Sequence, residues 1–105
     1  IEKYDLTDTV RVRQIDFFDL NPLEITDQIG TVCINPPSGR RLGGKQVSDE
    51  LFNAIGGRLN QAYKGWKLAL LAPSRKVAAL LPFQTHSMPV QHGGLKLRLL
   101  TGRIK

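Results

Sequence analysis

The sequence predicts an α/β fold in which a mostly parallel sheet ends in an antiparallel hairpin. Short apolar segments alternate with helical segments along the chain, and strands in such an order pair in parallel through right-handed crossovers. Near the end, two apolar segments are joined by Gln91-His92-Gly93-Gly94, which favours a hairpin turn. With 105 residues, of which 41% are hydrophobic and 23% charged, the chain forms at most one globular domain.

Five strands are expected. An imperfect alternation of apolar and polar residues predicts the first strand over residues 10–15, ending at Asp16. The second strand, over residues 31–34, is expected to be buried, with Cys33 as a structural thiol inside it. The remaining strands are expected at residues 66–71, 86–90 and 95–104.

One long helix and one short helix are expected between these strands. Ser48 is suited to cap the start of the long helix, and Gly65 is suited to end it. Gly56-Gly57 lowers the helix propensity, so we expect the helix to pack closely on the sheet there. A short helix is expected at residues 75–81. The apolar face of the long helix is formed by Leu51, Phe52, Ile55, Leu59, Ala62 and Tyr63.

The strand at residues 31–34 leads directly into Asn35-Pro36-Pro37. Neither proline has an N–H group for a strand ladder, so the chain leaves the sheet at Asn35 with a stiff backbone and free carbonyl groups. Such an arrangement suits a site that accepts hydrogen bonds from an amino group. The alternative interpretation is a strand that ends in a proline-rich turn. A Gly- and Arg-rich loop over residues 40–45 follows.

The charges are distributed unevenly along the chain. Residues 1–37 contain three Lys/Arg and seven Asp/Glu, whereas residues 38–105 contain twelve and two. The basic part favours a polyanion such as RNA or DNA as partner, and the alternative is a basic surface without one. No metal site is expected, because His86 and His92 have no Cys or His neighbours at ligand spacing. Without a signal peptide or an apolar run of membrane-spanning length, a cytoplasmic location is expected.

Three motifs, in this order and spacing, resemble the methylase domain of THUMP-containing RNA methyltransferases, a family that includes enzymes forming N2-methylguanosine in ribosomal RNA and in tRNA. The segment from Asn35 to Gly43, Asn-Pro-Pro-Ser-Gly-Arg-Arg-Leu-Gly, is similar to the family's Asn-Pro-Pro-Tyr-Gly-x-Arg-Leu-Gly. Gly65-Trp66 before an apolar strand looks like the family's Gly-Trp. The closing turn resembles the family's Asn-Gly hairpin, with His92 in place of Asn. The resemblance extends from Val12 onward.

The resemblance implies a Rossmann-like methyltransferase domain that uses S-adenosylmethionine (SAM). The family's glycine-rich SAM loop and the acidic residue that binds the cofactor ribose have no counterpart in residues 1–105. We therefore expect these residues to be the C-terminal half of the domain, with the SAM-binding half absent. The exposed sheet edge would then be covered by that half or by a second copy of the chain.

The resemblance also implies roles for single residues. The Asn35 side chain and the Pro36 carbonyl would accept hydrogen bonds from the target amine, and Pro37 would help to fix the backbone. Ser38 replaces the family's aromatic residue, which stacks on the target base. Asn35 is also expected to contact the cofactor. Further contacts are expected from Asp16 and Phe17 with the adenine of SAM, and from Arg40, Arg41 and Lys45 with RNA phosphates.

Two other functions remain open from the sequence. The first is methylation of an amino group in DNA or of a protein glutamine, because Asn-Pro-Pro occurs in these methylases too. The second is a non-catalytic nucleic-acid-binding module or degenerate methylase. Ser38, the missing SAM loop and the basic part of the chain favour this second alternative.

Overall fold

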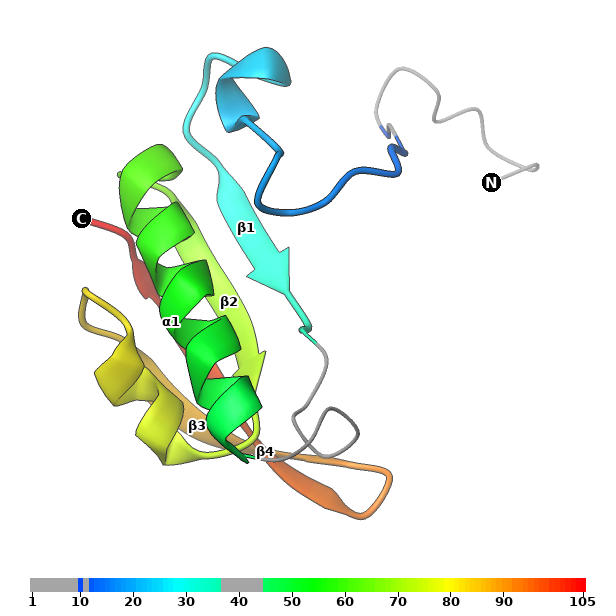
Figure 1. Ribbon diagram of the computed structural model, residues 1–105, viewed down its shortest axis with the longest axis vertical. Helices are drawn as coiled ribbons and strands as arrows, with labels where there is room; N and C mark the ends of the chain where they lie inside the picture. Colours follow the sequence, from blue (N-terminus) through cyan, green and yellow to red (C-terminus); the bar gives the residue numbers. More distant parts are fainter. Residues whose placement is uncertain (1–9, 11, 37–44) are drawn as a thin grey trace.

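The computed structural model describes residues 10, 12–36 and 45–105 (Figure 1). Helix α1 and the short 3-10 helix η2 lie on the same face of a four-stranded sheet, and a second 3-10 helix, η1, precedes the sheet (Figure 1). In chain order, the elements are η1 (Pro22–Glu24), β1 (Thr31–Ile34), α1 (Lys45–Ala62), β2 (Lys67–Ala72), η2 (Arg75–Leu80), β3 (His86–His92) and β4 (Leu95–Arg103).

The described strands form one mixed sheet in the order β1-β2-β4-β3. Strand β1 runs parallel to β2, with Thr31 opposite Lys67 and Ile34 opposite Leu70. Strand β4 runs antiparallel to both β2 and β3. The α/β class and the terminal hairpin are thus confirmed. The prediction of a mostly parallel sheet is corrected, because only one of these three strand pairings, β1–β2, is parallel.

The strand expected over residues 10–15 is not formed by the described residues, and this prediction was wrong. Residues 12–16 have no regular structure, and Val12 is 90% exposed. Alternating apolar residues indicate one face of a strand but do not supply a neighbour for its backbone hydrogen bonds. No described strand pairs with this segment, so its apolar residues remain at the surface.

Strand β1 is an edge strand whose side chains alternate between exposed and half-buried. Val32 and Ile34 pack against the core on the α1 side. Because successive side chains of a strand alternate between faces, Cys33 lies on the opposite face, where Figure 1 shows no helix. Cys33 is therefore exposed, which corrects the prediction of a buried thiol.

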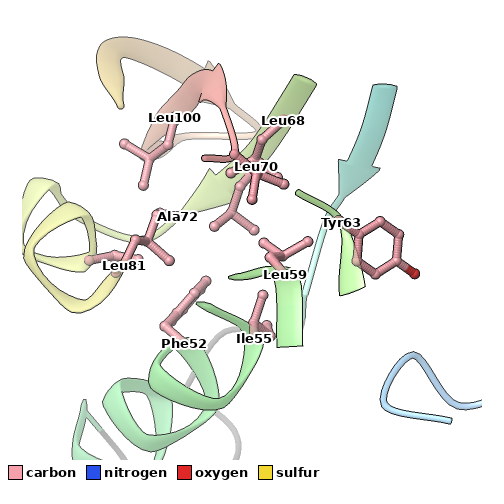
Figure 2. Packing of buried hydrophobic residues seen from close by; sticks show 11 residues of the cluster. Phe52, Ile55, Leu59, Tyr63, Leu68, Leu70, Ala72, Leu81 and Leu100 are labelled. Carbon is pink, nitrogen blue, oxygen red and sulfur yellow. The ribbon is translucent and has the colours of Figure 1, made fainter. Parts of the chain in front are cut away.

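Helix α1 packs on the sheet through the face that the sequence predicts. Phe52, Ile55 and Leu59 are buried against strand residues that include Leu70 and Leu100 (Figure 2). Removing each such side chain from water contributes about 1.5–3 kcal/mol to the free energy of folding, so the contact between α1 and the sheet stabilises the fold. The other buried members of the core are Tyr63, Leu68, Ala72, Val77, Leu81 and Ile104.

The boundaries of α1 differ from the prediction at its start. The helix includes Lys45, so Ser48 lies inside it and is not its N-cap, and Lys45 is not in a loop. Lys45 and Gln46 are favourable helix formers, and no residue from Lys45 to Ser48 stops a helix. The end agrees with the prediction, because Gly65 adopts a φ of 90° shortly after Ala62.

The glycine pair in α1 has one member in a close contact. A Cβ atom on Gly56 would lie 3.0 Å from Cδ of Pro82 and 3.1 Å from Cδ2 of Leu81, whereas one on Gly57 would meet nothing within 4 Å. The close approach is thus to the chain that follows η2. The expected close contact with the sheet at this glycine pair is corrected accordingly.

Candidate functional site

Asn35 and Pro36 lie where β1 leaves the sheet, at the carboxyl ends of the parallel strands β1 and β2. The strand ends at Ile34, because Pro36 has no N–H group to donate. Asn35 is exposed and Pro36 is half-buried. Ligands bind outside the carboxyl ends of the strands in open α/β sheets, so this edge is the candidate site.

The acceptors of this site are free within the part of the chain that the structure describes. There the Asn35 side chain makes no hydrogen bond to any described residue. The side-chain carbonyl of Asn35 and the main-chain carbonyl of Pro36 can each accept hydrogen bonds. Four of the other predicted site residues lie outside the described residues: Pro37, Ser38, Arg40 and Arg41. Lys45 is the first described residue of α1.

Asp16 lies in a turn that uses part of its carboxylate. Oδ1 of Asp16 accepts a hydrogen bond from the Phe18 amide at 2.9 Å. The Asp16 carbonyl accepts two more, from the amides of Asp19 and Leu20. This arrangement is an Asx turn, and Asp16 is otherwise exposed.

Phe17 belongs to a cluster of aromatic side chains. Its ring stacks on Tyr63, with 6.0 Å between the centroids and 12° between the planes. Tyr63 in turn meets Trp66 edge to face at 5.4 Å. Such pairs add about 0.5–1.5 kcal/mol beyond the area that they bury. The cluster fixes the segment around Phe17 to the end of α1.

The described residues do not bring Asp16 and Phe17 together with Asn35. Arg58, near the end of α1, donates a hydrogen bond of 2.7 Å from Nη2 to the carbonyl of Leu20, and Tyr63 holds Phe17. Arg58 lies in the last turns of α1 and Tyr63 follows this helix, shortly before β2 begins, whereas Asn35 follows the end of β1, the parallel partner of β2. The strand length, about 3.3 Å per residue, separates the two groups. The assignment of all three residues to one SAM site stays a prediction.

Burial alters the chemistry of Tyr63. Loss of water around its phenol raises the pKa above the ordinary 10.0, and the positive charge of Arg58 offsets part of this rise. Within the described residues, the Tyr63 hydroxyl and Nε of Arg58 are buried without hydrogen-bond partners. Neither residue was singled out from the sequence, where Tyr63 reads only as part of an apolar helix face.

The described residues contain neither a candidate metal site nor a helix that could span a membrane. No three His, Cys, Asp or Glu side chains of the described chain converge to hold a metal ion. None of the helices in this part of the chain has the length and apolar character needed to cross a bilayer.

Sequence reasoning also missed three basic residues, Arg75, Lys96 and Arg98. These residues line one groove at the end of β2, on the same edge of the sheet as Asn35. The sequence analysis chose Arg40, Arg41 and Lys45 as contacts for RNA phosphates, because they follow Asn-Pro-Pro closely in the chain. A usable signal was present, because no Asp or Glu follows Glu50 in the chain. The distance between Arg75 and Arg98 along the chain conceals their grouping.

Comparison with known proteins identifies similar sequences over nearly the whole chain. The family model UPF0020, described as RMKL-like, methyltransferase domain, matches residues 1–98. The ribosomal RNA large subunit methyltransferase K/L of Stutzerimonas stutzeri (strain A1501) is 29% identical over 106 residues, covering 100% of this chain and 15% of that protein. The protein of the same name from Marinomonas sp. (strain MWYL1) is 30% identical over 115 residues, with coverages of 100% and 15%. The chain spans about 15% of the length of these curated relatives.

A solved structure shares the fold. SMU.472, assigned as a methyltransferase and crystallised in complex with SAH, matches with a TM-score of 0.77 and 23% sequence identity. The match covers 96% of this chain and 26% of that chain. The predicted Rossmann-like α/β architecture is thereby confirmed for the matched part of the sheet and its helices.

Proposed function

We propose that this chain, which belongs to the UPF0020 family of RMKL-like methyltransferase domains, is part of the catalytic domain of a SAM-dependent enzyme. Its substrate is the exocyclic amino group of a nucleobase in ribosomal RNA, and guanine N2 is the amine that we infer. The observation that supports the proposal is the position of Asn35 and Pro36 at the carboxyl end of β1. The names of the relatives support ribosomal RNA over tRNA as substrate.

The proposed role of Asn35 follows from the chemistry of the amine. The lone pair of an exocyclic amine is delocalised into the ring, so the nitrogen is a weak nucleophile. Two acceptors that hold its two N–H groups orient the lone pair toward the methyl donor. The Asn35 side chain and the Pro36 carbonyl would supply this orientation and a preorganised electrostatic environment. The target base would have to be unpaired or flipped out of a helix to reach them.

SAM is the methyl donor in this proposal, which the SAH complex of SMU.472 supports. Among the described residues, Phe17 stacks on Tyr63 just after α1, whereas Asn35 follows the end of β1. We propose that a segment outside this chain, or a second copy, completes the SAM site and pairs with the open edge of β1. Action on ribosomal RNA would place the enzyme in the cytoplasm.

The second candidate function is a nucleic-acid-binding module without methyl transfer. Asp16 is the residue expected to contact the adenine of SAM. Its turn favours this second candidate, because Oδ1 already accepts a hydrogen bond from the Phe18 amide. The replacement of the family's aromatic residue by Ser38 favours it as well. This candidate predicts RNA binding without any dependence on Asn35.

A chimera tests the proposal. This chain would replace the matching segment of the S. stutzeri relative, and transfer of tritiated methyl groups from SAM to large-subunit ribosomal RNA would be measured. We expect the chimera to be active and Asn35→Ala to lower its rate about 10²–10³-fold, the usual effect of removing one preorganised polar group. Asn53→Ala, at an exposed position of α1, is the matched control and should leave the rate unchanged. Equal rates for the two variants would refute the role of Asn35, and a folded but inactive chimera would favour the second candidate.

A further inference from the structure

A groove of about 700 Å³ opens at the edge of the sheet where β2 ends. One wall is the segment that follows β2 and begins η2, and the other is the end of the β3–β4 hairpin. Because Ala72, the last residue of β2, pairs with Arg98, the hairpin residues before Arg98 extend past β2 (Figure 1). The lining residues are Pro73, Ser74, Arg75, Pro89, Val90, Gln91, Lys96, Leu97 and Arg98.

The groove is positively charged. Three of its lining residues are cationic, Arg75, Lys96 and Arg98, and none is Asp or Glu. Arg75 and Lys96 are exposed, and neither forms an ion pair with a described residue. No Asp or Glu follows Glu50 in the chain. The segments that line the groove all come after Glu50, so they contain no carboxylate side chain. A cleft lined by one sign of charge attracts ligands of the opposite sign.

Arg98 is held in place by the neighbouring strand. Its Nε donates to Oγ of Ser87 at 2.7 Å, and its Nη2 donates to the Ser87 carbonyl at 3.1 Å. These bonds use two of the five guanidinium N–H groups, and the others have no partner among the described residues. A guanidinium that is fixed in this way can bind a phosphate through two N–H groups with little loss of entropy.

The groove lies close to the proposed amine acceptors. Ile34 is opposite Leu70, so Asn35 and Pro36 leave β1 at the level where β2 ends and the groove wall begins at Pro73. Adjacent strands of a sheet are about 4.8 Å apart. A nucleic-acid strand whose base reached Asn35 would therefore have its neighbouring phosphates within reach of the groove.

We propose that this groove binds the sugar–phosphate backbone of the RNA strand that contains the target nucleotide, an inference that rests on the proposed function. Arg75, Lys96 and Arg98 neutralise phosphates, and contacts of this kind fix the position of the strand without reading its sequence. The groove thereby holds the strand in register while the base enters the site beside Asn35.

Fluorescence anisotropy with a short, labelled single-stranded RNA tests this inference on the full chain. The groove variant is Arg75→Gln/Lys96→Gln, which leaves the hydrogen-bonded Arg98 intact. The matched control is Lys64→Gln/Lys105→Gln, which removes the same charge from exposed positions near the opposite edge of the sheet. We expect the groove variant to bind RNA about tenfold more weakly, with a salt slope lower by about 1.4 for two lost phosphate contacts. The control should change affinity less than about twofold.

Equal weakening in the groove and control variants, or none in either, would overturn the proposal, because binding would then follow net charge or another surface. Circular dichroism of each variant would verify that the fold is unchanged. This binding assay contains no SAM and measures no methyl transfer. A failure of the groove proposal therefore appears in binding, whereas a failure of the proposed function appears in methyl transfer by the chimera.

Discussion

Asn35 owes its position to the residues on both sides of it. The apolar strand before it pairs with β2 up to Ile34, and the proline after it cannot continue the ladder. Its side chain is exposed at the strand end, where its amide is available to a ligand instead of to the fold. A substitution at such a position changes stability by no more than about 0.5 kcal/mol, so effects of Asn35→Ala on methyl transfer would report on the site.

Tyr63 is the residue whose chemistry the fold alters most clearly. Because burial raises the pKa of its phenol above 10.0, the folded state keeps this proton at a pH where the unfolded state has lost it. The stabilising contribution is complete below pH 10 and declines as the pH rises through and above that value. We expect the free energy of unfolding to fall in this range.

Tyr63→Phe is the matched variant for this prediction. It should remove this component of the alkaline decline, as measured by urea denaturation at several pH values. At neutral pH its stability should stay within about 1 kcal/mol of the original, because the lost hydroxyl has no hydrogen-bond partner among the described residues. An identical alkaline decline in both proteins would contradict this account.

Helix α1 contains its own matched pair of glycines. Gly57→Ala should raise the free energy of unfolding by about 0.5–1 kcal/mol, because alanine favours a helix and nothing lies near the new methyl group. Gly56→Ala should lower it by about 1–3 kcal/mol, because the methyl group would press on Pro82 and Leu81. Thermal unfolding of both variants distinguishes the effects, and equal stabilisation by both would show that the Gly56 contact yields easily.

Elements with a local cause could be predicted from the sequence. Gly93-Gly94 forms the hairpin turn, with φ values of 56° and 82°, because glycine adopts positive φ without steric cost. The apolar face of α1 follows from its 3.6-residue period. The predictions of a buried Cys33 and of a strand over residues 10–15 were wrong for the same reason. The burial of these residues depends on a neighbouring element, and an apolar pattern does not say whether that element is present.

The candidate site was predictable to a similar extent. Asn35 and Pro36 follow a strand by sequence alone, so the end of β1 could be located. The packing of Phe17 on Tyr63 and the hydrogen bond from Arg58 to Leu20 join residues 38 or more positions apart. No local pattern encodes such contacts. The groove of Arg75, Lys96 and Arg98 likewise exists only after the hairpin has folded against the segment that follows β2.

At the scale of the whole molecule, the two edges of the described sheet differ. Strand β3 contains Pro89, which cannot donate to an added strand. Strand β1, Thr-Val-Cys-Ile, contains neither a proline nor a charge, and such an edge favours pairing with another strand. We expect the chain to associate with itself through β1 when no other segment covers that edge.

Sedimentation velocity over a range of concentrations tests this expectation. Cys33→Lys places a charge at an exposed position of β1 and should shift the chain toward the monomer. Met88→Lys, at a position of β3 that is 53% exposed, is the control and should leave association unchanged. A monomeric unsubstituted chain, or equal dissociation by both variants, would contradict pairing through β1.

The central claim is that this fold presents Asn35 and Pro36 to an exocyclic amine of ribosomal RNA. Mass spectrometry of nucleosides from RNA that the chimera has modified tests it most directly, with the Asn35→Ala chimera as the comparison. The account predicts a methyl group on an exocyclic amino nitrogen, guanine N2, and its near absence with Asn35→Ala. A methyl group on a ring carbon, a ring nitrogen or the ribose, or an amine product that Asn35→Ala forms equally well, would contradict it.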